Sequence, residues 1–143
     1  MNITLFALSC LALVSCATGY TPRMFYSNIE VVNHSGETIS NLEVQIGADE
    51  RILRCDTVTK NRICYERFGR RYYPRQTIEL SWQDSAGKMQ SRQLEPSVPV
   101  TLSPAVPMRI LLEINADGSV EVEFREDNVR VRASLLHSLG LAA

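Results

Sequence analysis

The residues of this sequence that are best suited to bind another molecule lie close together, in the segment 65–75. It reads YERFGRRYYPR and places four arginines among four aromatic side chains. Guanidinium groups bind carboxylates and phosphates through paired hydrogen bonds, and tyrosines add rigid contact area with a polar tip. The segment therefore predicts a contact surface for an anionic or protein partner. The residues assigned to this surface are Arg67, Arg70, Arg71, Tyr72, Tyr73 and Arg75.

The distribution of charge along the chain allows two interpretations of this segment. The formal net charge is -1, yet residues 51–75 contain eight of the fifteen Lys and Arg side chains and two of the sixteen acids. Charge runs are also typical of solvated loops, and exposed arginines often pair with acids of their own chain. The acids available for such pairing are Glu121, Glu123, Glu126 and Asp127. The sequence alone does not decide between a surface that binds a partner and one whose arginines pair with acids of the same chain.

Catalytic and metal-binding patterns have little support in the sequence. Glu121 and Glu123 offer two carboxylates, as a glycosidase needs, but their spacing of two places both on the solvated face of a strand. His34 lies in a predicted turn and His137 in the C-terminal tail, so neither suits a Ser-His-Asp arrangement. Residues 115–126 carry oxygen ligands with calcium-loop spacing, but their glycine is fourth instead of sixth. The sequence predicts no catalytic residue, metal ion or cofactor.

The first fifteen residues predict a secretory leader. Every side chain from residue 3 to residue 17 is apolar or small and uncharged. A helix over this run rises only about 22 Å, against a hydrocarbon core of roughly 30 Å, so it is short for a membrane span. Its length is that of the apolar region of a signal peptide. The residues Leu13-Val14-Ser15-Cys16 resemble the lipobox of bacterial lipoproteins.

This resemblance implies cleavage before Cys16 and attachment of a lipid, including palmitate, to that cysteine. Ala17 follows the cysteine instead of the Asp that marks inner-membrane retention, which implies an outer-membrane lipoprotein that faces the periplasm. Ordinary cleavage after Ala17 and a buried N-terminal strand are the alternatives, and both leave Cys16 without a role. The anionic partners of such a location are lipid A phosphates, peptidoglycan carboxylates and acidic envelope proteins, whereas nucleic acid is not expected.

Cys55 and Cys64 are the two cysteines that remain once the leader is removed and Cys16 is lipidated. The compartment beyond the inner membrane is oxidising, so this pair predicts a disulfide. If Thr59 and Lys60 form a two-residue turn, the cysteines face each other across a hairpin at a non-hydrogen-bonded pair. Closing this loop should stabilise the fold by about 2.5 to 3 kcal/mol. A metal site or redox pair is the alternative, which the lack of CxxC spacing and of a nearby histidine disfavours.

The rest of the sequence predicts short strands separated by turn residues, and these strands must position the residues described above. Residues 25–46, 77–94 and 108–126 each have the pattern of a hairpin, with alternating apolar side chains before a turn that contains glycine. The alternation continues after the turn in the first and third, whereas the return strand of the second is more polar. In the third hairpin, whose turn is an Asp-Gly pair, two apolar rows are expected to meet: Ile110, Leu112 and Ile114 with Val120, Val122 and Phe124. Residues 96–107 contain four prolines and therefore predict an edge strand or a crossing connection.

Seven or eight such strands with almost no helical periodicity predict an all-β fold, an antiparallel β-sandwich of immunoglobulin-like or transthyretin-like type. Trp82 is expected to be buried on a middle strand. The two cysteines are expected to lie too close in sequence for the inter-sheet bridge of antibody domains. The predicted organisation is a signal peptide at 1–15, a lipid-anchored tether at 16–24, the sandwich at 25–127, and a C-terminal tail or short helix at 128–143.

Two hypotheses about function follow from the sequence. The first is a non-catalytic envelope lipoprotein whose sandwich presents a basic, aromatic surface to a partner. The alternative is a small envelope hydrolase that works through carboxylates. A pocket with two converging acids of perturbed pKa would favour the hydrolase, and a shallow surface would favour the interaction module.

Overall fold

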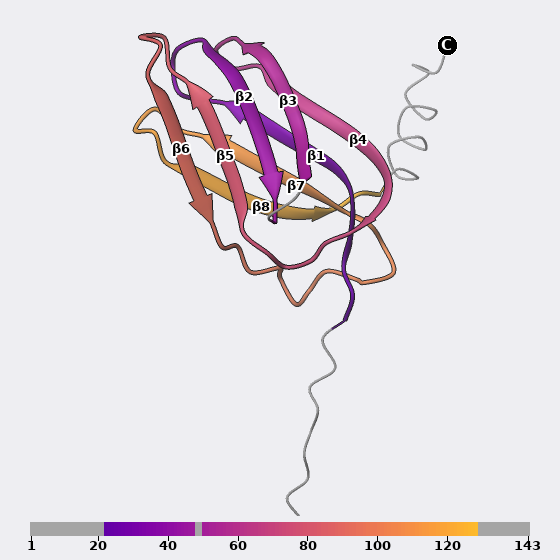
Figure 1. Ribbon diagram of the computed structural model, residues 1–143. Coiled ribbons are helices and arrows are strands. Elements are labelled where there is room, and N and C mark those ends of the chain that lie inside the picture. Colours follow the sequence, from indigo (N-terminus) through magenta and orange to yellow (C-terminus); the bar gives the residue numbers. More distant parts are fainter. Residues whose placement is uncertain (1–21, 48–49, 129–143) are drawn as a thin grey trace, which may run out of the picture.

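A computed structural model describes residues 22–47 and 50–128, which form a two-layered β-sandwich (Figure 1). This architecture confirms the predicted fold class. The predicted signal peptide, the tether up to residue 21 and the tail after Asn128 lie outside the described residues. The strands are β1 (Phe25–Asn33), β2 (Ile39–Ile46), β3 (Glu50–Val58), β4 (Ile63–Tyr72), β5 (Ile78–Gln83), β6 (Met89–Leu94), β7 (Met108–Ile114) and β8 (Val120–Glu126). Within these ranges there is no helix that is long and apolar enough to cross a membrane.

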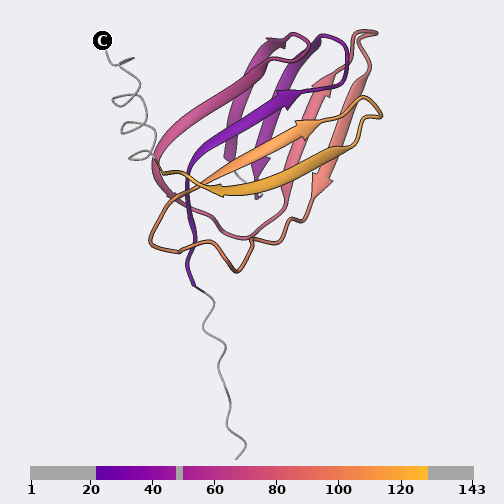
Figure 2. The ribbon, with the colours of Figure 1, turned by 180° about the vertical axis from the view of Figure 1, so that it is seen from behind.

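The eight strands form two sheets of four. The first, sheet A, has the order β4-β1-β7-β8, and the second, sheet B, has the order β3-β2-β5-β6. Figure 2 shows sheet A from outside, with β1 between β4 and β7. Strands β1 and β7 pair in parallel, and every other pair is antiparallel. Sheet A is therefore a mixed sheet.

The core lies between the two sheets, because alternate side chains of each strand point inward. In β5 the burial alternates along the strand, and Trp82 is buried as predicted. The fully buried side chains include Ile29, Val31, Ile39, Leu42, Val44, Ile78, Leu80, Ile110, Leu112 and Ile114. Burying a branched apolar side chain stabilises a fold by roughly 1.5 to 3 kcal/mol, so these rows determine which face of each strand turns inward.

Two of the three predicted hairpins are confirmed. Strands β5 and β6 pair from Ile78 with Leu94 to Gln83 with Met89. Strands β7 and β8 pair with the predicted facing of Ile110, Leu112 and Ile114 against Phe124, Val122 and Val120. Gly118 in the second of these turns has φ 77°, a backbone conformation that favours glycine. The Asp-Gly signal therefore indicated a real turn.

The predicted first hairpin is wrong, because β1 and β2 belong to different sheets. Residues 34–38 cross from sheet A to sheet B instead of turning back along β1. Both neighbour positions of β1 are taken, one by β4 and the other by β7, so β2 has no edge of β1 to join. Asn33, at the end of β1, also directs the crossing: its Nδ2 donates to the carbonyl oxygens of Glu37 at 2.8 Å and Val58 at 2.9 Å.

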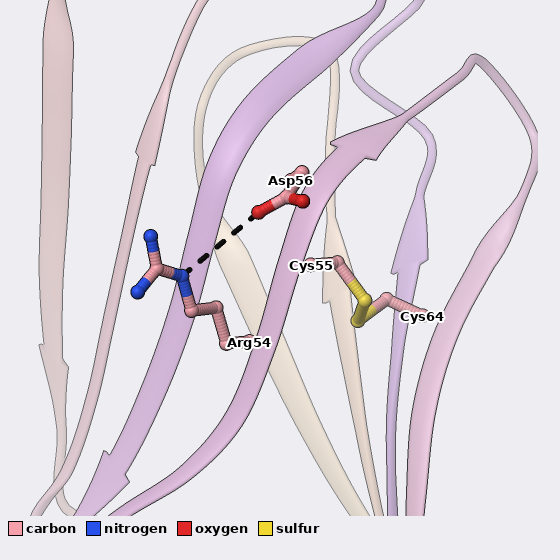
Figure 3. Close-up of a disulfide and its surroundings, with 4 residues drawn as sticks. All are labelled: Arg54, Cys55, Asp56 and Cys64. Atoms are coloured by element: carbon pink, nitrogen blue, oxygen red, sulfur yellow. Dashed lines mark ion pairs between the residues drawn. A yellow bond between two sulfur atoms is a disulfide. The ribbon is translucent and has the colours of Figure 1, made fainter.

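The predicted disulfide is present, but it does not close a hairpin. Strand β3 lies at the edge of sheet B and β4 at the edge of sheet A, so the bond between Cys55 and Cys64 joins the two sheets (Figure 3). The predicted hairpin between the cysteines is therefore wrong. The bond joins the sheets through two consecutive edge strands, unlike the bridge of antibody domains, for which the cysteines were expected to be too close. Four residues suffice for the crossing, since the Arg62 N–H donates to the Thr59 carbonyl oxygen at 3.1 Å and Asn61 adopts φ 58°.

The proline-rich segment is a connection, as one of its two interpretations predicted. Residues 95–107 form no strand and lead from β6 in sheet B to β7 in sheet A. Val98 and Leu102 pack against the core from this segment. The connection passes the end of the sandwich where β4 finishes, and this places it beside the predicted contact residues.

Candidate functional site

The predicted contact residues lie on β4, the edge strand of sheet A. Five large apolar side chains are exposed in the described part of the chain, and three of them, Ile63, Tyr65 and Tyr72, lie on this strand. β4 pairs only with β1 in its own sheet, from Val32 opposite Ile63 to Phe25 opposite Tyr72. The strand therefore combines exposed aromatic side chains with arginines that the sequence predicted for the contact surface.

The Arg70 guanidinium lies over an aromatic ring of the neighbouring strand. Its guanidinium carbon is 4.1 Å from the centre of the Phe25 ring, and its Nη2 donates to the Pro104 carbonyl oxygen at 3.3 Å. Phe25 in turn meets Tyr72 edge to face, with ring centres 6.1 Å apart. A guanidinium that stacks on a ring keeps its in-plane N–H donors directed sideways, where an anion can accept them.

Arg71 repeats this arrangement toward the other side of the strand. Its guanidinium carbon lies 4.5 Å from the centre of the Phe68 ring. Phe68 packs against the buried Tyr26 with ring centres 5.7 Å apart. The two adjacent arginines of the segment are thus both held on aromatic supports, so their positions are fixed by the packing of the domain.

Arg75 and Arg67 differ from the stacked pair. The Arg75 Nη2 donates to the Pro22 carbonyl oxygen at 3.0 Å, and Arg75 itself has φ 55°, a left-handed conformation that is uncommon outside glycine. Arg75 therefore holds the first described residue of the chain against the domain. Arg67 is exposed opposite Asn28, and its side chain forms no hydrogen bond or ion pair with the residues that the structure describes.

Tyr73, which the sequence assigned to the contact surface, belongs to the core. Its side chain is fully buried and lies against Tyr26 and Phe124, with ring centres 6.4 and 5.6 Å away. Burial raises the pKa of the Tyr73 hydroxyl to about 12. Side chains alternate between inward and outward only within a strand, and β4 ends at Tyr72. The sequence therefore did not separate the exposed Tyr72 from the buried Tyr73.

Within the described residues, internal salt bridges do not account for Arg67, Arg70 and Arg75. Among the described residues, Arg67, Arg70 and Arg75 pair with no carboxylate. The acids that the sequence offered as partners are used elsewhere: Glu123 accepts from Arg125 at 2.7 Å, Glu126 from the Ser103 N–H at 3.1 Å, and Asp127 from Ser27 at 2.6 Å. The guanidinium charges of Arg67, Arg70 and Arg75 are therefore not neutralised within the described chain.

An open pocket adjoins the stacked arginine. It has a volume of about 400 Å³ and is lined by Arg23, Phe25 and Tyr72. Phe25 begins β1 and Arg23 lies just before it. The sequence did not connect these residues with the segment 65–75, because two other strands lie between them along the chain. We call Arg23, Phe25, Arg67, Arg70, Arg71 and Tyr72 the arginine–aromatic surface.

A polar cleft of about 320 Å³ at the opposite end of the sandwich contains the carboxylates Glu37, Asp84 and Asp117. Hydrogen bonds from the Lys88 N–H and the Gln90 side chain hold the pKa of Asp84 below its ordinary value. Hydrogen bonds from Ser119 do the same for Asp117. These acids close turns, and a lowered pKa is opposite to what a general acid needs.

The described part of the chain gives no other grouping with catalytic geometry. Glu121 and Glu123 are exposed on β8, as their spacing predicted. His34 is exposed in the crossing between β1 and β2. Across residues 22–47 and 50–128, no three His, Cys, Asp or Glu side chains gather closely enough to hold a metal ion.

Comparisons with known proteins do not place the chain in a family. No protein-family model matches it, and no curated protein does. The NMR structure of the protein from Eubacterium rectale is similar with a TM-score of 0.44 and 11% sequence identity, over 76% of this chain and 93% of that one. This similarity is too low to support a conclusion about function.

Proposed function

We propose that this protein is a non-catalytic envelope lipoprotein, anchored through Cys16 in the outer membrane and facing the periplasm, whose β-sandwich presents the arginine–aromatic surface to an anionic or protein partner. Lipid A phosphates, peptidoglycan carboxylates and acidic patches of envelope proteins have the complementary charge. The leader with its lipobox-like residues supports the anchor.

The binding role rests on the position and the hydrogen-bond partners of the Arg70 guanidinium. This group is fixed on Phe25 and has no carboxylate partner among the described residues. An arginine held on a rigid support loses little side-chain entropy on binding, so its remaining donors can contribute more of their hydrogen-bond energy to affinity. A hydrolase is the alternative function, and Asp84 and Asp117 of the polar cleft give it no support because backbone hydrogen bonds engage them in turns.

The binding role is tested by replacing Arg70 and Arg71 with Ala and recovering partners from solubilised envelope membranes. We expect recovery to fall strongly, and recovery by the wild type to weaken as salt rises, because exposed charges are screened over about 8 Å at physiological ionic strength. Arg54→Ala with Arg125→Ala is the matched control, since it removes the same charge from exposed arginines on other strands.

Thermal unfolding must accompany this comparison. Each lost stack should cost about 0.5 to 1 kcal/mol, so the double variant is expected to melt a few degrees lower but to stay folded. Equal partner recovery by the Arg70/Arg71 variant and by the control variant would contradict the proposed binding surface. The arginines would then serve the stability of the edge strand alone.

A further inference from the structure

Both described ends of the chain leave the sandwich beside the arginine–aromatic surface. Arg75 holds Pro22 there through the hydrogen bond to its carbonyl oxygen. At the other end, the Asp127 N–H donates to the Pro107 carbonyl oxygen at 2.8 Å, and Ser27 donates to the Asp127 carboxylate. Figure 2 shows the chain entering β1 at the end of the sandwich where β4 and β8 finish.

The anchor of the proposed function, on which this inference rests, would lie close to this end. Six residues along the chain lead from Cys16 to Pro22. A fully extended chain spans at most about 3.6 Å per residue, so Pro22 can lie no more than about 22 Å from the lipid-bearing cysteine. Because Arg75 holds Pro22 against the domain, this short reach brings the end of the sandwich with Arg23 and Phe25 to the bilayer.

The side chains at this end match the chemistry of a phospholipid surface. Arg23, Phe25 and Tyr72 line the 400 Å³ pocket, and Arg70 is stacked on the Phe25 ring beside it. Guanidinium groups bind phosphate through paired hydrogen bonds. Aromatic side chains prefer the membrane interface, where an apolar ring and a polar tip are both accommodated. The half-exposed Tyr72 has this character.

We infer that the end of the sandwich formed by Arg23, Phe25, Arg70 and Tyr72 contacts the surface of an anionic phospholipid bilayer. Headgroup phosphates accept hydrogen bonds from the two arginines, and the two rings pack at the interface. A bilayer suits this surface because it presents many phosphates in one plane, opposite Arg70 on the edge strand β4 and Arg23 just before β1. The chain after Asn128, which continues from the same end, adds two arginines and no acidic side chain.

The inference is tested by chemical footprinting of the purified, membrane-processed protein on vesicles. The vesicles contain phosphatidylcholine alone or mixed with phosphatidylglycerol. Arg23 and Arg70 are expected to react with phenylglyoxal several-fold more slowly on the anionic vesicles, as read by mass spectrometry of their peptides. The difference should vanish at about 1 M salt, where the Debye length is about 3 Å. Arg54 on β3 and Arg62 in the crossing at the opposite end of the sandwich are the internal controls, and both should react equally on both kinds of vesicle.

Charge reversal at one position strengthens the test. Arg70→Glu should abolish the protection of Arg23, whereas Arg54→Glu should leave it unchanged. Soluble glycerophosphate at matched phosphate concentration should not protect Arg70, which separates a bilayer from a single free phosphate. Equal reactivity of Arg70 on neutral and anionic vesicles would overturn the inference.

Failure of the bilayer inference can be distinguished from failure of the proposed function. If Arg70 is unprotected on vesicles but the Arg70/Arg71 variant loses a protein or glycan partner in the membrane pull-down, the binding surface stands and the bilayer inference is wrong. If the purified protein does not stay on neutral vesicles, the anchor is wrong. In that case, flotation of the protein with anionic vesicles still tests whether the surface binds an anionic bilayer. Failure of the protein to float with these vesicles overturns the inference.

Discussion

At the scale of single residues, Asn33 is a buried polar side chain that bonds to the segments on both crossings between the sheets. It is fully buried, and its side chain makes four hydrogen bonds. Nδ2 donates to the Glu37 and Val58 carbonyl oxygens, and Oδ1 accepts from the Ser35 N–H and hydroxyl. Its backbone also bonds to residues 61 and 62 of the second crossing. One amide therefore joins the two crossings between the sheets.

Replacing Asn33 with Ala should lower the free energy of unfolding by about 3 kcal/mol or more, because two carbonyl oxygens and a backbone N–H lose their partners. Asn28→Ala is the matched control. Asn28 is equally buried, but it makes a single side-chain bond, to Glu30, and its Oδ1 has no partner among the described residues. We expect the control to lose only about 1 kcal/mol. Urea unfolding measures both, and equal losses would contradict this role of Asn33.

The sequence predicted three of the four arginines of the surface, missing Arg23, and it did not predict what supports them. Arg70 and Arg71 were recognised because they lie side by side among tyrosines. Their supports, Phe25 and Phe68, are ordinary strand aromatics, and Phe25 reaches Arg70 only through the pairing of β1 with β4. Such contacts depend on strand order, which a single sequence does not encode locally.

At the scale of elements, the two edge strands β3 and β4 form one side of the sandwich. Edge strands expose unpaired backbone groups, which natural proteins protect from pairing with other chains. The disulfide between Cys55 and Cys64 joins these two edges, and Figure 3 shows it spanning from one strand to the other. Its role is therefore to hold the sheets together at their open side, not to strengthen a hairpin.

Replacing both Cys55 and Cys64 with Ser should lower the free energy of unfolding by about 2.5 to 3 kcal/mol, since the crosslink limits the unfolded chain. Hydrogen exchange should rise most in β3 and β4, because these edges lose the crosslink that holds them together. Reductant should reproduce the loss in the wild type and leave the double variant unchanged. Neither thiol should titrate in the denatured wild type without reductant, and two free thiols would refute the bond.

The elements differ in how far the sequence could predict them. The turn between β7 and β8 was predictable because Asp117 and Gly118 satisfy a tight turn by themselves. The crossings at residues 34–38 and 59–62 contain similar polar residues, yet they lead to another sheet. Turn residues specify that the chain bends, whereas the partner of the next strand depends on long-range pairing that the local sequence does not contain.

At the scale of the whole molecule, the two ends of the sandwich have different chemistry. One end carries the arginine–aromatic surface and both described chain ends. The other holds the cleft with Glu37, Asp84 and Asp117. The sequence predicted a basic segment but not where its cations lie. Arg70 and Arg71 join Arg23 at one end, whereas Arg62 lies in the crossing at the other end and Arg92 lines the cleft there. An anchor near the arginine–aromatic surface would orient the polar cleft away from an anionic bilayer.

This orientation requires the anchor itself, which a labelling experiment tests. Cells that produce the wild type should incorporate radioactive palmitate into the protein, since a lipobox-type leader implies that Cys16 carries lipid. Cys16→Ala should abolish the label, and Cys10→Ala is the matched control that should keep it, because Cys10 lies within the leader that is removed. Equal labelling of the wild type and Cys16→Ala would refute lipidation at this position. A labelled protein that fractionates with the outer membrane would place the arginine–aromatic surface within reach of headgroup phosphates, because a tether of six residues extends no more than about 22 Å.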